Sequence, residues 1–209
     1  GTNVASDALT YLSTAGVVGG ALIVVGEDYG EGASVALERT HAFALKSSMW
    51  MLDPRPNLPT IVRMVEKGFE LSEASNAPVM MELRIRACHV RGRFATSPNR
   101  APAVSTRNRL AAPAAFVYER LSHPPATFRQ EKLKVGVRMP AARRFIAGHR
   151  LNETFAGTEL GVGIIVQGGL YNNLVRALQI LGLADAFGTC RVPMLALNVV
   201  YPLVPEEIT

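Results

Sequence analysis

Long apolar runs are missing from this sequence of 209 residues. The apolar stretch at residues 21–25 is far shorter than the ~20 residues that a membrane-spanning helix needs. No charged segment followed by an apolar stretch and a small-residue cleavage site is visible, so nothing signals export. These absences exclude the integral membrane proteins, and we expect a cytoplasmic protein that does not contact a membrane.

Cysteine is almost absent as well. Cys88 and Cys190 lie far apart in the sequence and form no metal-ligand pair. Two such cysteines cannot hold an iron–sulfur cluster. The pattern predicts two buried free thiols in a reducing compartment.

Acidic residues are scarce in the middle of the chain. Between Arg84 and Arg150 there are fifteen lysines or arginines and only two acids, Glu119 and Glu131, whereas the remainder carries seven basic and fifteen acidic residues. A basic middle of this kind suits nucleic acid, an acidic partner subunit or an anionic cofactor. The aromatic residues in the stretch match no base-stacking motif, so we expect no nucleic acid to bind.

What the sequence does contain is an alternation of apolar strands and amphipathic helices. Its clearest helix is predicted at residues 58–75, where apolar side chains recur at spacings of three and four. The other early elements follow from similar patterns: strands at 21–25, 49–52 and 79–85, and helices at 8–15 and 33–46. This order predicts an α/β fold in which helices cover a parallel sheet.

Proline interrupts residues 95–150 repeatedly, which predicts a linker or wrapping arm with one or two short helices near 140–149. The alternation then resumes, with a strand at 163–166, a turn at 167–169, a helix at 171–183 and a strand at 194–200. We therefore divide the chain into three segments: 1–94, a basic connector at 95–150, and 151–209. The apolar sheet elements near both ends lack neighbours, so we expect a piece of a larger protein.

The first candidate site follows the strand at 21–25. Ligands of α/β proteins bind at the carboxyl ends of strands, so Asp28, Tyr29 and Ser34 could face a cofactor or substrate. Asp28 and Ser34 could equally only shape the turn or cap the next helix. Glu38, a further candidate cofactor contact, shares a helix face with His41. That pair suits acid–base chemistry, a metal or an ordinary surface or interdomain contact.

The second candidate site ends the strand at 79–85. Arg84, Arg86 and His89 could bind a substrate carboxylate, which arginine holds in bidentate fashion. A structural ion pair with Glu82 or with an acidic partner is the alternative. The sequence identifies no catalytic residue and no metal-ligand set.

Three stretches resemble a known family. Residues 19–30 (Gly-Gly-Ala-Leu-Ile-Val-Val-Gly-Glu-Asp-Tyr-Gly) with 38–44, and residues 69–84 with His89, resemble the thiamine-pyrimidine-binding domain of indolepyruvate ferredoxin oxidoreductase. Residues 163–169 (Gly-Ile-Ile-Val-Gln-Gly-Gly) with 197–203 are similar to the domain that follows in that family, which is of the transketolase C-terminal type. The blocks occur in the same order as in the large subunit.

The resemblance implies oxidative decarboxylation of an aryl 2-oxoacid, such as indolepyruvate, to an aryl-acetyl-coenzyme A with ferredoxin as acceptor. It implies thiamine diphosphate, Mg²⁺ and iron–sulfur clusters as cofactors, and other segments or subunits of a homo- or hetero-oligomer as partners. The glutamate that contacts the aminopyrimidine ring, the diphosphate site and the cluster ligands are expected outside this sequence. We therefore expect these 209 residues to be inactive alone.

Two other interpretations remain open. One is a segment of a related pyruvate or 2-oxoglutarate oxidoreductase, which would differ in pocket size rather than in chemistry. The other is a non-catalytic assembly module that binds partner chains. The basic connector discriminates between the interpretations: it either wraps a neighbouring subunit or lines a cleft that binds anions such as coenzyme A.

Overall fold

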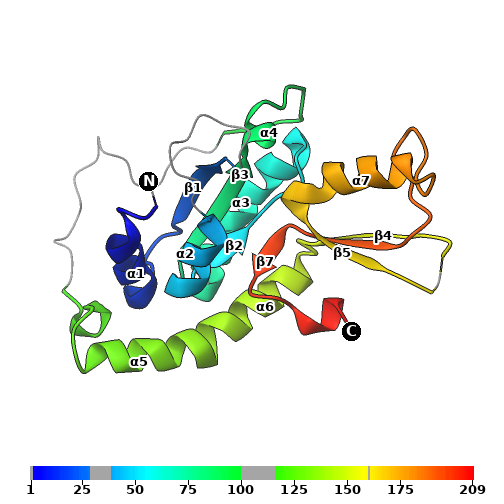
Figure 1. Ribbon diagram of the computed structural model, residues 1–209. Coiled ribbons are helices and arrows are strands. Elements are labelled where there is room, and N and C mark those ends of the chain that lie inside the picture. The colour runs from blue at the N-terminus through cyan, green and yellow to red at the C-terminus, as the bar shows by residue number, and fades with distance from the viewer. Residues whose placement is uncertain (1, 29–38, 100–115, 160) are drawn as a thin grey trace.

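The structure is a computed structural model that describes residues 2–28, 39–99, 116–159 and 161–209 (Figure 1). Three candidate residues, Tyr29, Ser34 and Glu38, lie outside these ranges. Within them, no helix combines the length and the apolar character that crossing a membrane requires.

The larger sheet has the strand order β1–β3–β2–β7. Its first three strands, β1 (Leu22–Glu27), β3 (Val79–Arg84) and β2 (Trp50–Leu52), run parallel. The last strand, β7 (Val199–Tyr201), pairs with β2 in the antiparallel direction. The parallel core confirms the predicted α/β class, and a strand from near the end of the sequence completes the sheet.

Helices cover both faces of this sheet (Figure 1). Successive side chains of a strand point to opposite faces, so Trp50 and Leu52 pack with α3 (Leu58–Ser75) and α6 (Met139–Gly148) in one apolar cluster. Met51 lies in a second cluster, beneath α1 (Ser6–Ala15) and α2 (Thr40–Ser47). The helix predicted at 58–75 is confirmed to the residue, with the Asn57 side chain accepting the Thr60 N–H at 3.0 Å as its cap.

A smaller sheet has the order β4–β6–β5. In it β5 (Ile164–Gln167) runs parallel to β6 (Met194–Leu197), and β4 (Glu153–Phe155) runs antiparallel to β6. The turn η3 (Gly168–Leu170) follows β5 and leads into α7 (Tyr171–Ile180), which packs over Met194 and Cys190. The short elements α4 (Ile85–Cys88), η1 (Tyr118–Arg120) and η4 (Pro205–Glu207) complete the described chain.

The helix expected near 140–149 is present as α6, but it continues a longer helical run than expected. In that run α5 (Ala126–Leu133) passes through a π-helical segment, Lys134–Arg138, into α6. The π segment ends two residues before Pro140, whose missing N–H and bulky ring do not fit a regular α-helical ladder. The strand predicted at 194–200 is split at Asn198 into β6 and β7, which belong to different sheets.

Candidate functional site

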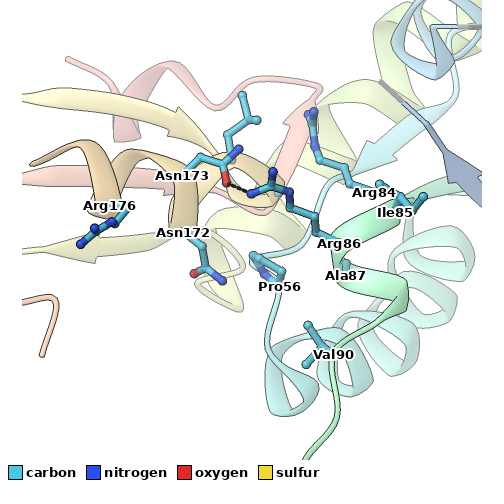
Figure 2. Close-up of a pocket in the computed structure, with 11 residues that line it drawn as sticks. Pro56, Arg84, Ile85, Arg86, Ala87, Val90, Asn172, Asn173 and Arg176 are labelled. Carbon is cyan, nitrogen blue, oxygen red and sulfur yellow. Dashed lines mark hydrogen bonds between the residues drawn. The ribbon is translucent and has the colours of Figure 1, made fainter. Parts of the chain in front are cut away.

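A pocket of about 560 Å³ opens at the carboxyl end of β3 (Figure 2). Arg84 at the end of β3 and Arg86 on α4 line one side of it, and Asn172, Asn173 and Arg176 on α7 line the other. No acidic side chain belongs to its described lining, which is otherwise apolar or glycine. Three guanidinium groups without a lining carboxylate favour an anionic ligand.

The parallel strands bring the charged groups of this region to one edge of the larger sheet. Arg84 Nη2 donates to Asp53 Oδ2 at 2.7 Å, just beyond β2, and to Gln167 Oε1 at 3.0 Å, at the end of β5. Arg84 Nε lies 3.5 Å from Glu82 Oε1. The ion pair with Glu82 that the sequence allowed is therefore present, and the same guanidinium also lines the pocket.

Asp53 is almost completely enclosed, at 1% exposure. Burial raises the pKa of its carboxyl, and the hydrogen bond from Arg84 only partly opposes that rise. The turn after β5 lies against this pair, because a Cβ atom on Gly169 would collide with Asp53 Oδ1 and Arg84 Nε. The glycine thus lets the smaller sheet approach the Asp53–Arg84 ion pair closely.

Arg86 and Arg176 each make a long hydrogen bond to a neighbouring amide side chain. Arg86 Nη1 reaches Asn173 Oδ1 at 3.5 Å, and Arg176 Nη1 reaches Gln179 Oε1 at 3.5 Å. Both bonds are long, and their acceptors are neutral amides. A ligand carboxylate would form stronger, charge-assisted hydrogen bonds with these guanidinium groups than the amides do.

The sequence identified only part of this pocket. Arg84 and Arg86 are brought together as expected, whereas His89 is exposed and does not belong to the lining. Asp28 is partly buried beyond β1 and does not line the pocket either. Arg176 was missed because nothing in the pattern of a helix at 171–183 indicates which distant strand it faces.

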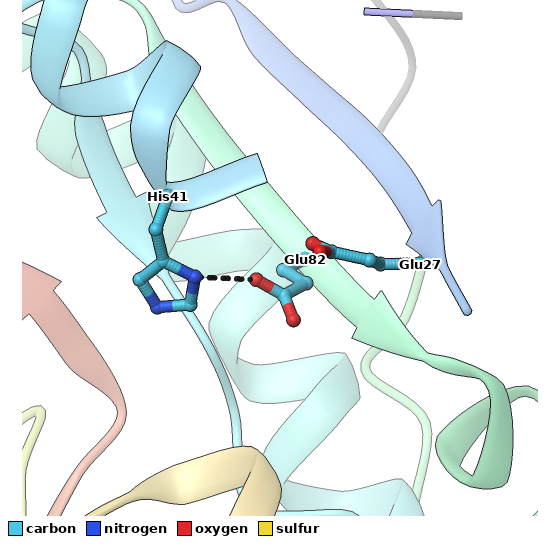
Figure 3. A group of neighbouring side chains, drawn as sticks. All are labelled: Glu27, His41 and Glu82. Carbon is cyan, nitrogen blue, oxygen red and sulfur yellow. Dashed lines mark ion pairs between the residues drawn. The ribbon is translucent and has the colours of Figure 1, made fainter. Parts of the chain in front are cut away.

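A second group of polar side chains lies beneath the same sheet edge (Figure 3). Glu27 ends β1, Glu82 lies on β3 and His41 lies on α2, and one candidate ligand atom from each falls within 4.8 Å of the others. His41 Nδ1 is 3.1 Å from Glu82 Oε2. The hydrogen bond to Glu82 raises the pKa of His41, and burial opposes it. The sequence associated His41 with Glu38 and gave no sign of Glu82 as a partner.

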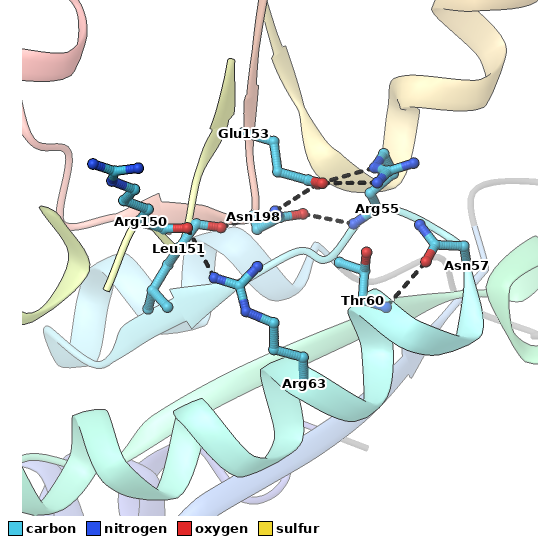
Figure 4. Close-up of polar contacts among 8 residues, drawn as sticks. All are labelled: Arg55, Asn57, Thr60, Arg63, Arg150, Leu151, Glu153 and Asn198. Atoms are coloured by element: carbon cyan, nitrogen blue, oxygen red, sulfur yellow. Dashed lines mark hydrogen bonds and ion pairs between the residues drawn. The ribbon is translucent and has the colours of Figure 1, made fainter. Parts of the chain in front are cut away.

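A network of hydrogen bonds joins the two sheets (Figure 4). Arg55 donates to Glu153 through Nε at 2.9 Å and Nη2 at 2.7 Å, and its guanidinium lies over the rings of Phe155 and Tyr171. The Asn198 side chain accepts the Arg55 N–H at 2.8 Å and donates to Glu153 Oε2 at 3.0 Å. This network holds the strand ends around the pocket in a fixed relation.

The Glu153 carboxylate should make stability depend on pH. Burial alone would raise its pKa, but hydrogen bonds from Arg55 and Asn198 outweigh burial and bring the pKa below the ordinary value of 4.5. A group whose pKa is lower in the folded state than in the unfolded state stabilises the fold at pH values above its unfolded-state pKa. That stabilisation is lost as the pH falls through the folded-state pKa. Urea unfolding should therefore show Glu153→Gln less stable than the wild type at pH 7, with the gap closing below pH 4.5. A gap that is constant with pH would contradict this prediction.

The cofactors that the resemblance implies do not fit the described residues. Cys190 is buried against α7, while Cys88 is exposed at the end of α4, which corrects the prediction of two buried thiols and leaves no iron–sulfur ligand set. The pocket lining offers no carboxylate for the Mg²⁺ that accompanies a diphosphate. The residues that the structure describes therefore form an arginine-lined pocket and not a complete cofactor site.

Comparison with known proteins gives two relatives. The chain is 30% identical over 203 residues to indolepyruvate oxidoreductase subunit IorA of Methanothermobacter marburgensis, and 27% identical over 207 residues to the same subunit of Methanothermobacter thermautotrophicus. Each match covers 97% of this chain. This chain is similar to IorA over nearly its whole length. It spans about 31% of the length of each IorA relative, and no family model matches it.

Proposed function

We propose that this chain forms the substrate-binding wall of a thiamine diphosphate-dependent oxidoreductase that converts aryl 2-oxoacids to aryl-acetyl-coenzyme A, with ferredoxin as electron acceptor. The pocket between α4 and α7 carries the proposal, because a 2-oxoacid presents a carboxylate and the pocket presents three arginines. Its position at the carboxyl ends of parallel strands is where α/β proteins bind ligands. The similarity to IorA over 97% of the chain supports the choice of substrate class.

In this proposal each lining group has a distinct part. Arg84 is fixed by Asp53 and Gln167, so its guanidinium holds one side of the pocket in a constant position. Arg86 and Arg176 bind the carboxylate directly, and Asn172 and Asn173 donate amide hydrogen bonds beside them. The apolar side chains of the lining, including Leu170, lie against the aryl group. The rest of the enzyme, which includes partner subunits, provides the cofactor sites.

Turnover by the enzyme in the form in which it purifies, with any partner subunit, tests the proposal. Under anaerobic conditions it is given indolepyruvate, coenzyme A, thiamine diphosphate and Mg²⁺, and the reduction of a low-potential dye is followed. Reduction that requires all four additions is the expected result. If phenylpyruvate, pyruvate and 2-oxoglutarate also give no reduction with a preparation that contains its iron–sulfur clusters, the chain is an assembly module instead.

Two variants test the pocket itself. Arg86→Gln and Arg176→Gln should each raise KM for the 2-oxoacid by about 10- to 100-fold, since a hydrogen bond to a charged group contributes ~1.5–3 kcal/mol. The value of kcat should change less, because the carboxylate is bound alike in the ground and transition states. Arg191→Gln is the matched control, as Arg191 forms an exposed ion pair with Glu159 away from the pocket. Unchanged KM in both pocket variants would exclude carboxylate binding here.

A further inference from the structure

The side chains of Glu27, His41 and Glu82 converge from three separate elements into a buried position that the pocket proposal does not use. Glu27 is 5% exposed and Glu82 is 0% exposed. Glu82 and Glu27 stand on neighbouring parallel strands, with Val25 paired to Glu82 and Glu27 paired to Arg84. His41 lies in the first turn of α2, which places its ring beside Glu82 (Figure 3).

The hydrogen bonds in this cluster leave specific lone pairs unused. Glu27 Oε2 accepts the Thr40 N–H at 3.0 Å, but Glu27 Oε1 is buried and has no hydrogen-bond partner. The His41 nitrogen that faces the two glutamates is Nδ1, and Nε2, also buried without a partner, lies on the other side of the ring (Figure 3). Glu82 Oε1 faces Arg84, and its other oxygen faces His41. Unsatisfied buried acceptors of this kind are costly and rare in folded proteins.

The local charge balance is a second argument that Glu27 requires a positive charge or a proton beside it. Three buried carboxylates, on Glu27, Asp53 and Glu82, lie at this sheet edge, and Arg84 forms ion pairs with the last two. Glu27 has no ion pair with any described residue. A carboxylate enclosed in this way requires either a cation or a proton to offset its desolvation.

We propose that Glu27, His41 and Glu82 bind one divalent transition-metal ion, of which Zn²⁺ is the representative. One imidazole and two carboxylates suit Zn²⁺ and similar ions better than Ca²⁺ or Mg²⁺, which prefer all-oxygen sites. Three protein ligands leave a further coordination position for water. Two ligands of one ion with bonds of ~2.0–2.2 Å lie at most ~4.4 Å apart. The three ligand atoms, which lie within 4.8 Å of one another, would therefore bind one ion after shifts of about half an ångström.

Hydrogen bonds outside the ligand set already orient two of its members. The Thr40 N–H fixes one oxygen of Glu27 and leaves the other available, and Arg84 does the same for Glu82. Such outer contacts commonly hold metal-binding carboxylates in position. Because the ligands stand on two neighbouring strands and a helix of the same sheet, the ion would fix α2 to β1 and β3. The inference requires no oxidoreductase activity, so it stands or fails separately from the proposed function.

Zn²⁺ binding by the intact protein tests this site. The wild type, Glu27→Gln and His41→Gln are stripped with a chelator, desalted and titrated with Zn²⁺, and bound zinc and Tm are measured. The wild type should bind one more Zn²⁺ per chain than either variant and show a Zn²⁺-dependent rise in Tm. Each variant should bind at this site with at least about 100-fold lower affinity. Metal bound elsewhere in a complex is the same in wild type and variants, so it does not contribute to the difference in bound zinc.

Glu159→Gln serves as the control, since Glu159 is an exposed carboxylate paired with Arg191. It should retain the wild-type stoichiometry. If the variants fold poorly, Co²⁺ added to the stripped wild type gives an independent readout, because a Co²⁺ ion bound by three protein ligands and a water in four-coordinate geometry produces strong visible absorption bands. Equal zinc binding by wild type and variants, or no such Co²⁺ bands in the wild type, would overturn the proposal.

Discussion

Replacing Arg84 by methionine is expected to lower the free energy of unfolding by about 3–5 kcal/mol, because it leaves buried charges without their partner. The Arg84 side chain is 12% exposed, and its ion-pair partners Asp53 and Glu82 are 1% and 0% exposed. Methionine has a similar reach and fills much of the same volume, so the loss reports charge rather than packing. Urea denaturation followed by circular dichroism at pH 7 measures the change.

The double variant Asp53→Asn, Arg84→Met separates this explanation from a simple loss of packing. If the uncompensated carboxylate causes the loss, removing its charge should restore part of the stability lost in Arg84→Met. Arg191→Met is the control for an exposed ion pair and should cost no more than ~1 kcal/mol. A loss in Arg84→Met as small as that in the control would show that Asp53 and Glu82 do not depend on the guanidinium.

The second large effect is expected at Asn198, which is fully buried. Its side chain accepts the Arg55 N–H at 2.8 Å and donates to the Leu151 carbonyl at 2.9 Å and to Glu153. Asn198→Leu preserves the approximate size and leaves a buried N–H and a buried carbonyl without partners, each of which costs ~1–3 kcal/mol. We expect a total loss of about 2–6 kcal/mol in urea denaturation.

Asn99, an exposed residue outside the regular elements, provides the control, since Asn99→Leu should change stability by less than ~0.5 kcal/mol. The activity of Asn198→Leu is also informative. If the Asn198 network positions Arg55 and the strand ends around the pocket, KM for the 2-oxoacid should rise although Asn198 does not touch the pocket. A variant as stable as the wild type would show that water replaces these hydrogen bonds.

Local pattern predicted most of the early elements well, but the prediction of a helix at 33–46 was wrong at Arg39, which is extended and precedes α2. The helix at 58–75 was predictable because its apolar stripe, its asparagine cap and its neighbouring prolines all indicate the same structure. The strand predicted at 79–85 was similarly clear, and β3 ends one residue earlier. In the basic connector the prolines indicated interruptions of regular structure, but Pro140 is accommodated within a helical run by the π segment. Local sequence does not show how the preceding helical turn adjusts to the missing backbone N–H of a proline.

The candidate site was less predictable than the fold. Arg84 and Arg86 were identifiable because they end a recognisable strand, but the residues they face on α7 are almost ninety positions away. The grouping of Glu27, His41 and Glu82 depends equally on strand order, which periodicity does not specify. The three segments 1–94, 95–150 and 151–209 remain a prediction, and β7 of the last segment pairs with β2 of the first. The cofactor contacts predicted at Asp28, Tyr29, Ser34 and Glu38 also remain predictions.

The antiparallel β2–β7 pair affects how the chain folds during its synthesis. Met51 pairs with Tyr201, and the rings of Trp50 and Tyr201 lie 5.9 Å apart, so the larger sheet closes only after about 150 further residues have been made. Pairings over such long separations form late. The nascent chain therefore displays the open edge of β2 throughout synthesis of the second half, and this edge is the segment most in need of chaperone protection.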